Sequence, residues 1–312
     1  MRAAGVRREF SELPANVRER IERALGSRIA AAETQPSGFS PGIAARVRLE
    51  NGERVFIKAV GPEPNPDSPG FHRRELEIVS SLPAHAPVPR LLASIDEGEG
   101  GWVALAFDEV HGSHPVEPWR ADELERVIEG AHELVAALTP SPIETPAAGP
   151  MLGDGINSWH LLRADPLPGL DAWSRRHLDA LVALESEVVT AVEGETLLHL
   201  DIRADNVLLT DERVYFVDWP HAHVGVAWLD AVCFAPSVAM QGGADPDEVL
   251  ARWPGGAVAA GDAVNAAVAS IAGFFTHRAL LPSPPGLPTL RAFQDAQGRV
   301  ARDWLARRAG WN

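Results

Sequence analysis

The side chains best suited to chemistry are gathered in one short stretch of the chain. His199, Asp201 and Asn206 follow the spacing H-x-D-x4-N, and Asp218 comes after two short apolar runs, VLL and VYFV, that flank the turn TDER. We expect these runs to pair as a hairpin, which brings the residues on its two flanks together at one end. Asn206 and Asp218 then offer oxygen ligands of the kind that Mg²⁺ accepts beside phosphate oxygens and water. Asp201, slightly apart, is placed to orient and deprotonate a hydroxyl group.

The plainer interpretation is that these polar residues only cap a hairpin, and a second feature of the chain weighs against it. Lys58 is the only lysine beside 27 arginines. It lies in RVFIKAV, an alternating apolar run in which a solvated surface cation is not expected. Arginine and lysine are not interchangeable where a compact point charge must reach a phosphate. We therefore interpret Lys58 as a functional residue rather than a chance survivor on the surface.

The first 110 residues are expected to form a small antiparallel sheet plus one helix. The turn Asn51-Gly52 between two alternating runs indicates a hairpin, and two further strands are predicted within residues 88–110, joined by DEGEGG. The helix is predicted over 71–83, and a short amphipathic helix is expected before the sheet, over 10–30. The stretches QPSGFSPG and GPEPNPDSPG are expected to be loops.

From Gly112 onward the pattern is mainly helical. Apolar residues recur at three- and four-residue spacing over 121–139 and 178–192, and the helical pattern returns over 248–312 with Pro/Gly interruptions at 281–288. The hairpin with the polar residues is therefore embedded among helices.

Charge and composition exclude several classes of protein. The 312-residue chain has a formal net charge of −15, and the sequence assigns −2 to residues 1–110 and −13 to the remainder. A general nucleic-acid surface is not expected, because polyanion binding needs a basic excess. The lone Cys233 excludes an internal disulfide and a multi-cysteine zinc site. No apolar leader and no membrane span is readable, so a cytoplasmic protein is predicted and no membrane partner.

The order of these features resembles that of kinases: a glycine-containing loop, a strand lysine, a helix glutamate, H-x-D-x4-N and a strand-end aspartate. HLDIRADNVLL, VYFVDW and RRELEIVSSLPAHAPVPRLL resemble segments of the aminoglycoside phosphotransferase family, and the resemblance covers about residues 37–235. It implies an α+β, bilobed protein-kinase-like fold. The N-terminal lobe, residues 1–110, would hold the nucleotide and end at a hinge. The larger helical lobe, residues 111–312, would carry the embedded catalytic hairpin, the metal site and the acceptor site.

The resemblance also implies roles for individual residues. Lys58 corresponds to the lysine that holds the α- and β-phosphates of the nucleotide. Glu75 corresponds to the helix glutamate that positions it, with Glu77 as the alternative. Asp201 matches the catalytic aspartate, and Asn206 and Asp218 match the magnesium ligands.

Two further segments would complete the nucleotide site. Asp108 to Val110, before His111, occupies the hinge, where backbone groups would bind adenine. In PSGFSPG, Ser40 and its flanking glycines could present N–H groups to the β-phosphate, although an ordinary hairpin loop is the alternative.

Two residues depart from the family pattern. Leu200 stands where the family usually has glycine, and Arg203 where it usually has histidine. We interpret Arg203 as a catalytic cation that faces the transferred phosphoryl group, while a salt bridge to Asp205 is an equally good explanation. Asp230, in WLDAV, is expected to brace the catalytic loop.

The resulting hypothesis is a phosphotransferase that uses ATP or GTP with Mg²⁺ and acts on a hydroxyl group of a small molecule. An aminoglycoside-like or other antibiotic, which would imply a role in resistance, and a metabolite are both open as acceptors. The acidity of the second part of the chain favours an acceptor with an amine, unless that acidity only solvates helix faces. The alternative function is a catalytically weak, kinase-shaped protein that binds a nucleotide or ligand. The oligomeric state is not indicated.

Overall fold

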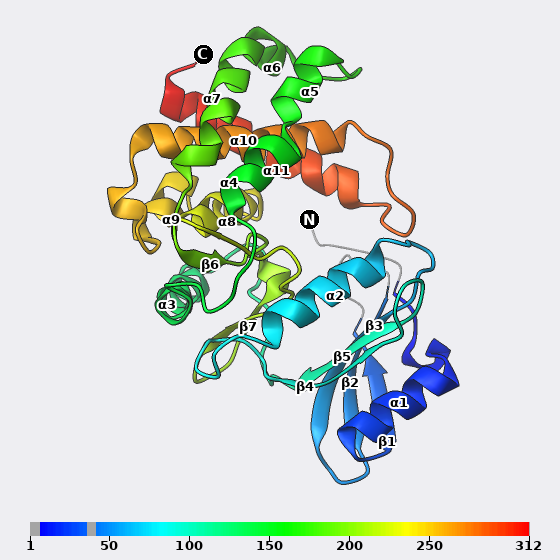
Figure 1. Ribbon diagram of the computed structural model, residues 1–312. Coiled ribbons are helices and arrows are strands. Elements are labelled where there is room, and N and C mark those ends of the chain that lie inside the picture. The colour runs from blue at the N-terminus through cyan, green and yellow to red at the C-terminus, as the bar shows by residue number, and fades with distance from the viewer. Residues whose placement is uncertain (1–6, 36–41, 312) are drawn as a thin grey trace.

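The N-terminal part is a five-stranded antiparallel sheet with a helix on each face (Figure 1). The computed structural model describes residues 7–35 and 42–311. The strand order is β1-β2-β3-β5-β4. The elements of this part are η1 (Phe10–Glu12), α1 (Ala15–Leu25), β1 (Ile29–Thr34), β2 (Ile43–Leu49), β3 (Arg54–Val60), α2 (Ser68–Val79), β4 (Leu91–Asp96) and β5 (Val103–Asp108).

Alternation along the strands determines which helix covers which face of the sheet. On β5, Ala104 and Ala106 belong to the apolar cluster that contains Ile21 of α1. Leu105 and Phe107 belong to the cluster that contains Ile78 of α2. Successive side chains of a strand point to opposite faces, so one strand serves both clusters.

Two sequence predictions about this part are wrong in detail. The helix expected over 10–30 ends earlier, because α1 ends at Leu25, Gly26 has a φ of 69°, and Ile29 and Ala30 already belong to strand β1. This left-handed conformation suits glycine and stops the helix. In addition, α2 begins at Ser68, inside the predicted loop, with Pro69 in its first turn, where proline costs no hydrogen bond.

The C-terminal part is mainly helical, as predicted, and contains two short two-stranded antiparallel sheets, the hairpin β7–β8 and the pair β6–β9. In Figure 1 the long helices α10 and α11 run side by side across its upper half. Its elements are α3 (Ala121–Ala137), α4 (Ala148–Pro150), η2 (Met151–Ile156), α5 (Ser158–Ala164), α6 (Ala172–Arg176), α7 (Leu178–Ala191), β6 (Thr196–Leu198), η3 (Ala204–Asn206), β7 (Val207–Leu209), β8 (Val214–Phe216), β9 (His223–Gly225), α8 (Leu229–Met240), α9 (Pro246–Arg252), η4 (Gly256–Val258), α10 (Gly261–Ala279) and α11 (Leu290–Ala309).

The chain passes from β5 into the C-terminal part through a segment that is tied to strand β7. Ser113 and Leu209 exchange backbone hydrogen bonds of 3.0 and 2.8 Å, and His114 Nδ1 lies 2.8 Å from the Val207 carbonyl oxygen. Gly112 allows this approach, because a Cβ there would lie 2.8 Å from the Leu209 carbonyl oxygen. The boundary predicted at residue 110 falls just before this segment and stays a prediction.

The bilobed α+β arrangement is the predicted fold class, and its sheet, helix and embedded hairpin are all present. The two parts are also joined through their cores. Ile78, Val79 and Ala86 pack in the apolar cluster of the C-terminal part. No described helix is both long and apolar enough to cross a membrane.

Candidate active site

Lys58 on β3 joins the two parts of the molecule at the centre of the site. Its Nζ lies 2.6 Å from Glu75 Oε2 on α2 and 2.6 Å from Asp218 Oδ1, just beyond β8. The pair with Glu75 is largely buried, whereas Glu77 is 66 % exposed and pairs with Arg74. The structure therefore places Glu75, and not Glu77, against Lys58.

Both Lys58 and Asp218 are held in their charged forms. Burial by itself would lower the pKa of Lys58, but the carboxylates of Asp218 and Glu75 raise it above its usual range. Burial would likewise raise the pKa of Asp218, but Lys58 brings it well below its usual range. The backbone of Asp218 is left-handed, with a φ of 72°, which is uncommon for a residue other than glycine.

The loop between β6 and η3 is fixed by Asp230 from α8. The Asp230 carboxylate accepts the N–H of Leu200 at 2.7 Å and that of His199 at 3.1 Å. Leu200 has a φ of 60°, a conformation that favours glycine, and the two bonds hold it there. Burial raises the pKa of Asp230 to about 6. The contacts agree with the predicted bracing position of Asp230.

His199 is the first residue of this loop and is fully buried. Its Nε2 is 3.0 Å from the Val217 carbonyl oxygen, and its Nδ1 accepts the N–H of Asp201 at 3.2 Å. Burial lowers its pKa to about 4, so the imidazole is neutral near pH 7. His199 therefore anchors the backbone on which Asp201 is carried.

Asp201 is held by two neighbours on the same loop. Asn206 Nδ2 donates to Asp201 Oδ2 at 3.0 Å and to the Asp201 carbonyl oxygen at 2.8 Å. Arg203 Nη1 donates to Asp201 Oδ1 at 2.8 Å. Burial raises the pKa of Asp201 despite the opposing effect of Arg203. A quarter of the Asp201 side chain remains exposed, so another molecule can reach it.

Arg203 makes both of the contacts between which the sequence left a choice. Its Nε and Nη2 each lie 2.9 Å from a carboxylate oxygen of Asp205, while Nη1 is on Asp201. Burial would lower the pKa of Arg203, but these two carboxylates raise it. The guanidinium also lies 5.7 Å from the ring centre of Phe293 on α11. The predicted salt bridge to Asp205 is thus present beside a contact with the predicted base.

The donor set at Asn206 and Asp218 fits Mg²⁺ bound together with a nucleotide. Both side-chain bonds of Asn206 use its nitrogen, which leaves the amide oxygen for a cation. The Val217 N–H donates to the Asn206 carbonyl at 3.0 Å, which keeps Asp218 beside Asn206. Nowhere in residues 7–35 and 42–311 do three His, Cys, Asp or Glu side chains form a metal cage. None is needed, because Mg²⁺ is commonly held by one or two carboxylates plus substrate phosphates.

At the predicted hinge, the side chain of Asp108 and part of the backbone already have partners. Asp108 is engaged by Arg90, whose Nε is 3.0 Å from Asp108 Oδ2, and the Asp108 N–H donates to the Arg90 carbonyl at 2.9 Å. The Val110 carbonyl accepts from Gly112 at 3.1 Å. The Val110 N–H has no partner within the described residues, and it stays the predicted adenine contact. Ser40 lies outside the described residues.

A sequence match decides the family. The model of the phosphotransferase enzyme family (APH) matches residues 37–265. The chain belongs to this family. The resemblance that the motifs indicated is thereby confirmed. Among curated proteins, none matches the chain.

Solved structures show that the phosphotransferase fold extends over almost the whole chain. A thermostable mutant of aminoglycoside phosphotransferase APH(4)-Ia, in a complex with AMP-PNP and hygromycin B, is 14 % identical, with a TM-score of 0.61 over 96 % of this chain and 99 % of that one. Choline kinase LicA from Streptococcus pneumoniae is 12 % identical, with a TM-score of 0.60 over 94 % and 98 %. Spectinomycin phosphotransferase APH(9)-Ia, in complex with ADP and spectinomycin, is 13 % identical, with a TM-score of 0.54 over 93 % and 97 %. The family match makes the chain a member of a phosphotransferase enzyme family, and these neighbours show that it has their fold.

Sequence reasoning did not single out His72 or Phe293. His72 is buried on α2, one turn before Glu75, and burial together with Lys58 lowers its pKa to about 3. Its three-residue spacing from Glu75 on a predicted helix was a usable signal. Phe293 reaches Arg203 across 90 positions of sequence, and no local pattern indicates that contact.

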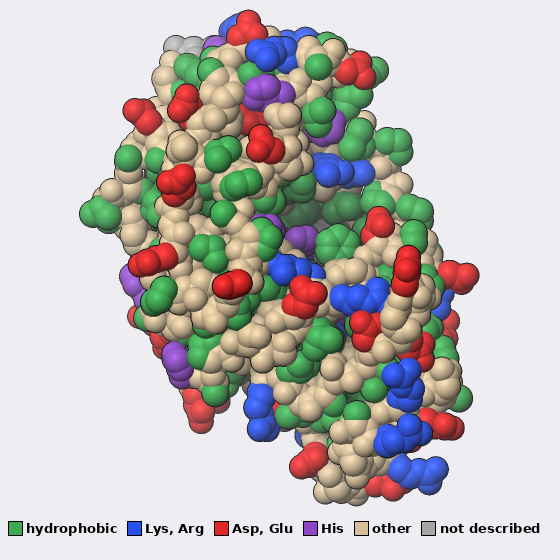
Figure 2. All heavy atoms as spheres, viewed as in Figure 1, with side chains coloured by type: hydrophobic (Ala, Val, Ile, Leu, Met, Phe, Trp, Pro, Cys, Tyr) green, Lys and Arg blue, Asp and Glu red, His purple; other side chains and the backbone are tan. Residues whose placement is uncertain are grey.

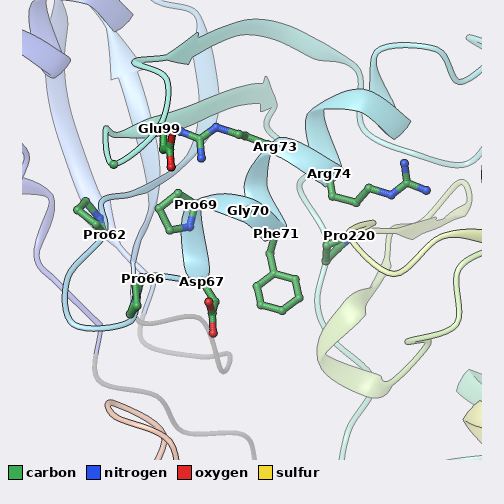
Figure 3. Close-up of a pocket in the computed structure, with 11 residues that line it drawn as sticks. Pro62, Pro66, Asp67, Pro69, Gly70, Phe71, Arg73, Arg74, Glu99 and Pro220 are labelled. Carbon is green, nitrogen blue, oxygen red and sulfur yellow. The ribbon is translucent and has the colours of Figure 1, made fainter. Parts of the chain in front are cut away.

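A separate groove of about 530 Å³ lies on the outer side of α2 (Figure 3). Phe71, which is 46 % exposed, lies there between Asp67 and Pro220. Neither Lys58 nor Asp201 lines this groove, so it is distinct from the site described above.

Proposed function

We propose that this protein transfers the γ-phosphoryl group of ATP or GTP, with Mg²⁺, to a hydroxyl group of a small molecule. The observation that carries the proposal is the position of Lys58, within 2.6 Å of both Glu75 and Asp218. A lysine from the sheet, a glutamate from the helix and an aspartate from the hairpin meet at one point. Phosphoryl transfer needs such an arrangement, since it depends on positioning and charge stabilisation.

Each residue of the site then has a defined task. Asp201 accepts the proton of the acceptor hydroxyl, and its raised pKa brings it closer to the range in which a general base works well at neutral pH. Lys58 binds the α- and β-phosphates and is oriented by Glu75. Asn206 and Asp218 hold Mg²⁺, which when bound neutralises phosphate charge. Arg203 keeps Asp201 in place and supplies positive charge near the transferred group.

The acceptor is proposed to be a hydroxylated antibiotic or metabolite. The acid surplus of residues 111–312 supports an acceptor that carries an amine, since such a surplus attracts cations. The ionic-strength dependence of the acceptor's KM tests for such an electrostatic contact. A cationic acceptor gives a KM that rises with salt at fixed Mg·ATP, whereas a flat response rejects the amine.

The direct test is ADP release from a panel of hydroxylated amines, sugars and antibiotics. We expect thermal stabilisation by Mg·ATP, slow ADP release without acceptor, and faster release with one class of acceptor. The alternative of a kinase-shaped binding protein has one supporting observation, which is that Arg203 already occupies Asp201. Such a protein would be stabilised by Mg·ATP and release no ADP, and that outcome would overturn the proposal.

A further inference from the structure

The acid surplus of the C-terminal part is not spread evenly over its helices. Residues 261–312, which include α10 and α11, contain six arginines and three aspartates, a net charge of +3. All the surplus acid of residues 111–312 therefore precedes α10. The last two helices form a basic region in an acidic protein.

Four of these six arginines are paired with carboxylates. The pairs are Arg299–Asp295, Arg302–Asp171, Arg307–Asp245 and Arg308–Asp247. Arg278 and Arg291 differ, since neither has a carboxylate within salt-bridge distance in the described part of the chain. Single arginines without a carboxylate partner are common on protein surfaces, whereas two such arginines close together are uncommon.

Arg278 and Arg291 lie where the end of α10 meets the start of α11. Arg291 donates through Nε and Nη2 to the Pro282 carbonyl, at 3.0 and 2.9 Å, and through Nη1 to Gln294 Oε1 at 2.8 Å. These three bonds orient its guanidinium without neutralising it. Arg278 is exposed, and its guanidinium lies 5.7 Å from the ring centre of Phe274.

The two guanidiniums and the neighbouring His277 influence one another. Burial and the positive charge of Arg278 lower the pKa of Arg291. Burial, Arg278 and Arg291 lower the pKa of His277. Gathering like charges in a partly buried place is unfavourable, and a bound anion would relieve it.

The first turn of α11, which carries Arg291, lies against the catalytic loop. Phe293, two positions after Arg291 on α11, contacts Arg203, and Arg203 contacts Asp201. Figure 2 shows a hollow between the two parts of the molecule, with apolar side chains in its depth. Basic side chains lie at its upper rim, over the place where α10 and α11 meet in Figure 1.

We propose that Arg278 and Arg291 form a subsite for an acidic group, a carboxylate or a phosphate, on the acceptor. The proposal deepens the proposed function, on which it rests, by naming a chemical feature of the acceptor. Arginine suits this task, because a guanidinium has five N–H donors, and the three bonds of Arg291 to Pro282 and Gln294 leave donors for an anion. The acid group would bind here while the hydroxyl group lies at Asp201, and an amine elsewhere on the acceptor is compatible with both contacts.

The test uses inorganic sulfate as the probe, with the nucleotide site filled by saturating Mg·AMP-PNP so that Lys58 is not available to it. Thermal unfolding is followed against sulfate and against sodium chloride at equal ionic strength. We expect sulfate to stabilise the wild type beyond the chloride control. The apparent Kd for sulfate should rise about tenfold or more in the double variant Arg278→Gln, Arg291→Gln, because charge-assisted hydrogen bonds are lost.

Two single variants distinguish loss of the subsite from a general effect on folding. Arg278→Gln alone removes only an exposed guanidinium and should weaken sulfate binding. The matched control Arg299→Gln, on the same helix but paired with Asp295, should leave it unchanged. Equal sulfate response in the wild type and the double variant, or no response beyond chloride in the wild type, would overturn the subsite.

Turnover separates this proposal from the broader one. D-glucose, D-glucosamine, D-glucuronate and D-glucose 6-phosphate share a ring and differ in charge. We expect the two acids to compete with sulfate in the wild type and not in the double variant. ADP release without acceptor should be equal in both proteins. If that release is intact and the acids fail to compete, the subsite is wrong and the phosphotransferase function stands. If no ADP is released while the acids compete, the phosphotransferase function is wrong and the anion site stands.

Discussion

Arg203 and Asp201 form a salt bridge on the catalytic loop, with Nη1 2.8 Å from Oδ1 and 3.1 Å from Oδ2. The remaining nitrogens of the guanidinium hold both oxygens of Asp205. The proposed base is thus fixed in orientation by a cation that is itself fixed. Only a side chain with several donors in one plane can do this, and the histidine usual in the family has no such fork.

Replacement of the proposed base tests this arrangement. In Asp201→Asn the Asn206 bond to the backbone carbonyl is retained, but the proton acceptor is lost. We expect kcat to fall by about 10²–10⁴-fold with little change in nucleotide binding. The matched control is Asp205→Asn, which removes the other carboxylate on Arg203 and should cost far less. Similar losses in both variants would mean that Asp201 is not the base.

Lys58→Arg tests whether the site needs a compact cation. The wider, planar guanidinium cannot keep both 2.6 Å contacts, so we expect roughly a hundredfold loss in kcat/KM for the nucleotide with the fold intact. Arg48→Lys, an opposite exchange at an exposed position of β2, should be neutral. Circular dichroism would establish folding, and wild-type kinetics in Lys58→Arg would contradict the role assigned to Lys58.

The choice between Glu75 and Glu77 can be tested with one pair of variants. Glu75→Gln removes a buried charge that is paired with Lys58, and we expect KM for the nucleotide to rise about tenfold or more, with lower stability. Glu77→Gln removes an exposed partner of Arg74 and should change neither quantity measurably. The reverse ranking in steady-state kinetics would assign the positioning role to Glu77.

Asp230 should make stability depend on pH in a particular direction. Burial raises its pKa to about 6 from 3.8, so the folded protein binds this proton more tightly than the unfolded chain does. The stability from protonation is present below about pH 4 and is lost as pH rises through 6, which amounts to about 3 kcal/mol. Asp230→Asn cannot ionise, although it gives up one accepted hydrogen bond.

Urea unfolding of the wild type and Asp230→Asn at several pH values measures this difference. The free energy of unfolding of the variant relative to the wild type should increase between pH 4 and pH 7. Parallel curves would show that the hydrogen bonds from His199 and Leu200 fully compensate the burial of the carboxylate.

Much of the architecture is readable from local pattern, and the exceptions have physical causes. Alternation in RVFIKAV placed Lys58 on a strand, and the Asn51-Gly52 turn predicted the β2–β3 hairpin, because both signals act over a few residues. Strand β1 was missed because IAAAET has no alternating pattern and only Ile29 is buried in it. Its place in the sheet depends on pairing with β2 rather than on its own composition.

The contacts of the site likewise fall into those that local spacing predicts and those that it does not. Asp201, Asn206 and Asp218 are connected by a short hairpin, so their spacing predicts that they meet. The contact of Arg203 with Phe293 joins segments tens of residues apart and depends on how α11 packs against the loop, which the sequence pattern does not specify. The contacts of His199 and Leu200 with Asp230 are equally distant in sequence, and the family resemblance rather than spacing led us to expect them.

The attachment of Ser113 and His114 to strand β7 determines which contacts can change if the cleft opens. β7 begins directly after Asn206, so the connecting segment and the hairpin proposed to hold Mg²⁺ would move together. Glu109, on the other side, is held by Arg54, which leaves Val110 and His111 as the pivot. A nucleotide would therefore keep its adenine and metal contacts at constant separation during opening. The contact proposed for Lys58, which strand β3 carries, would be broken and remade in each cycle.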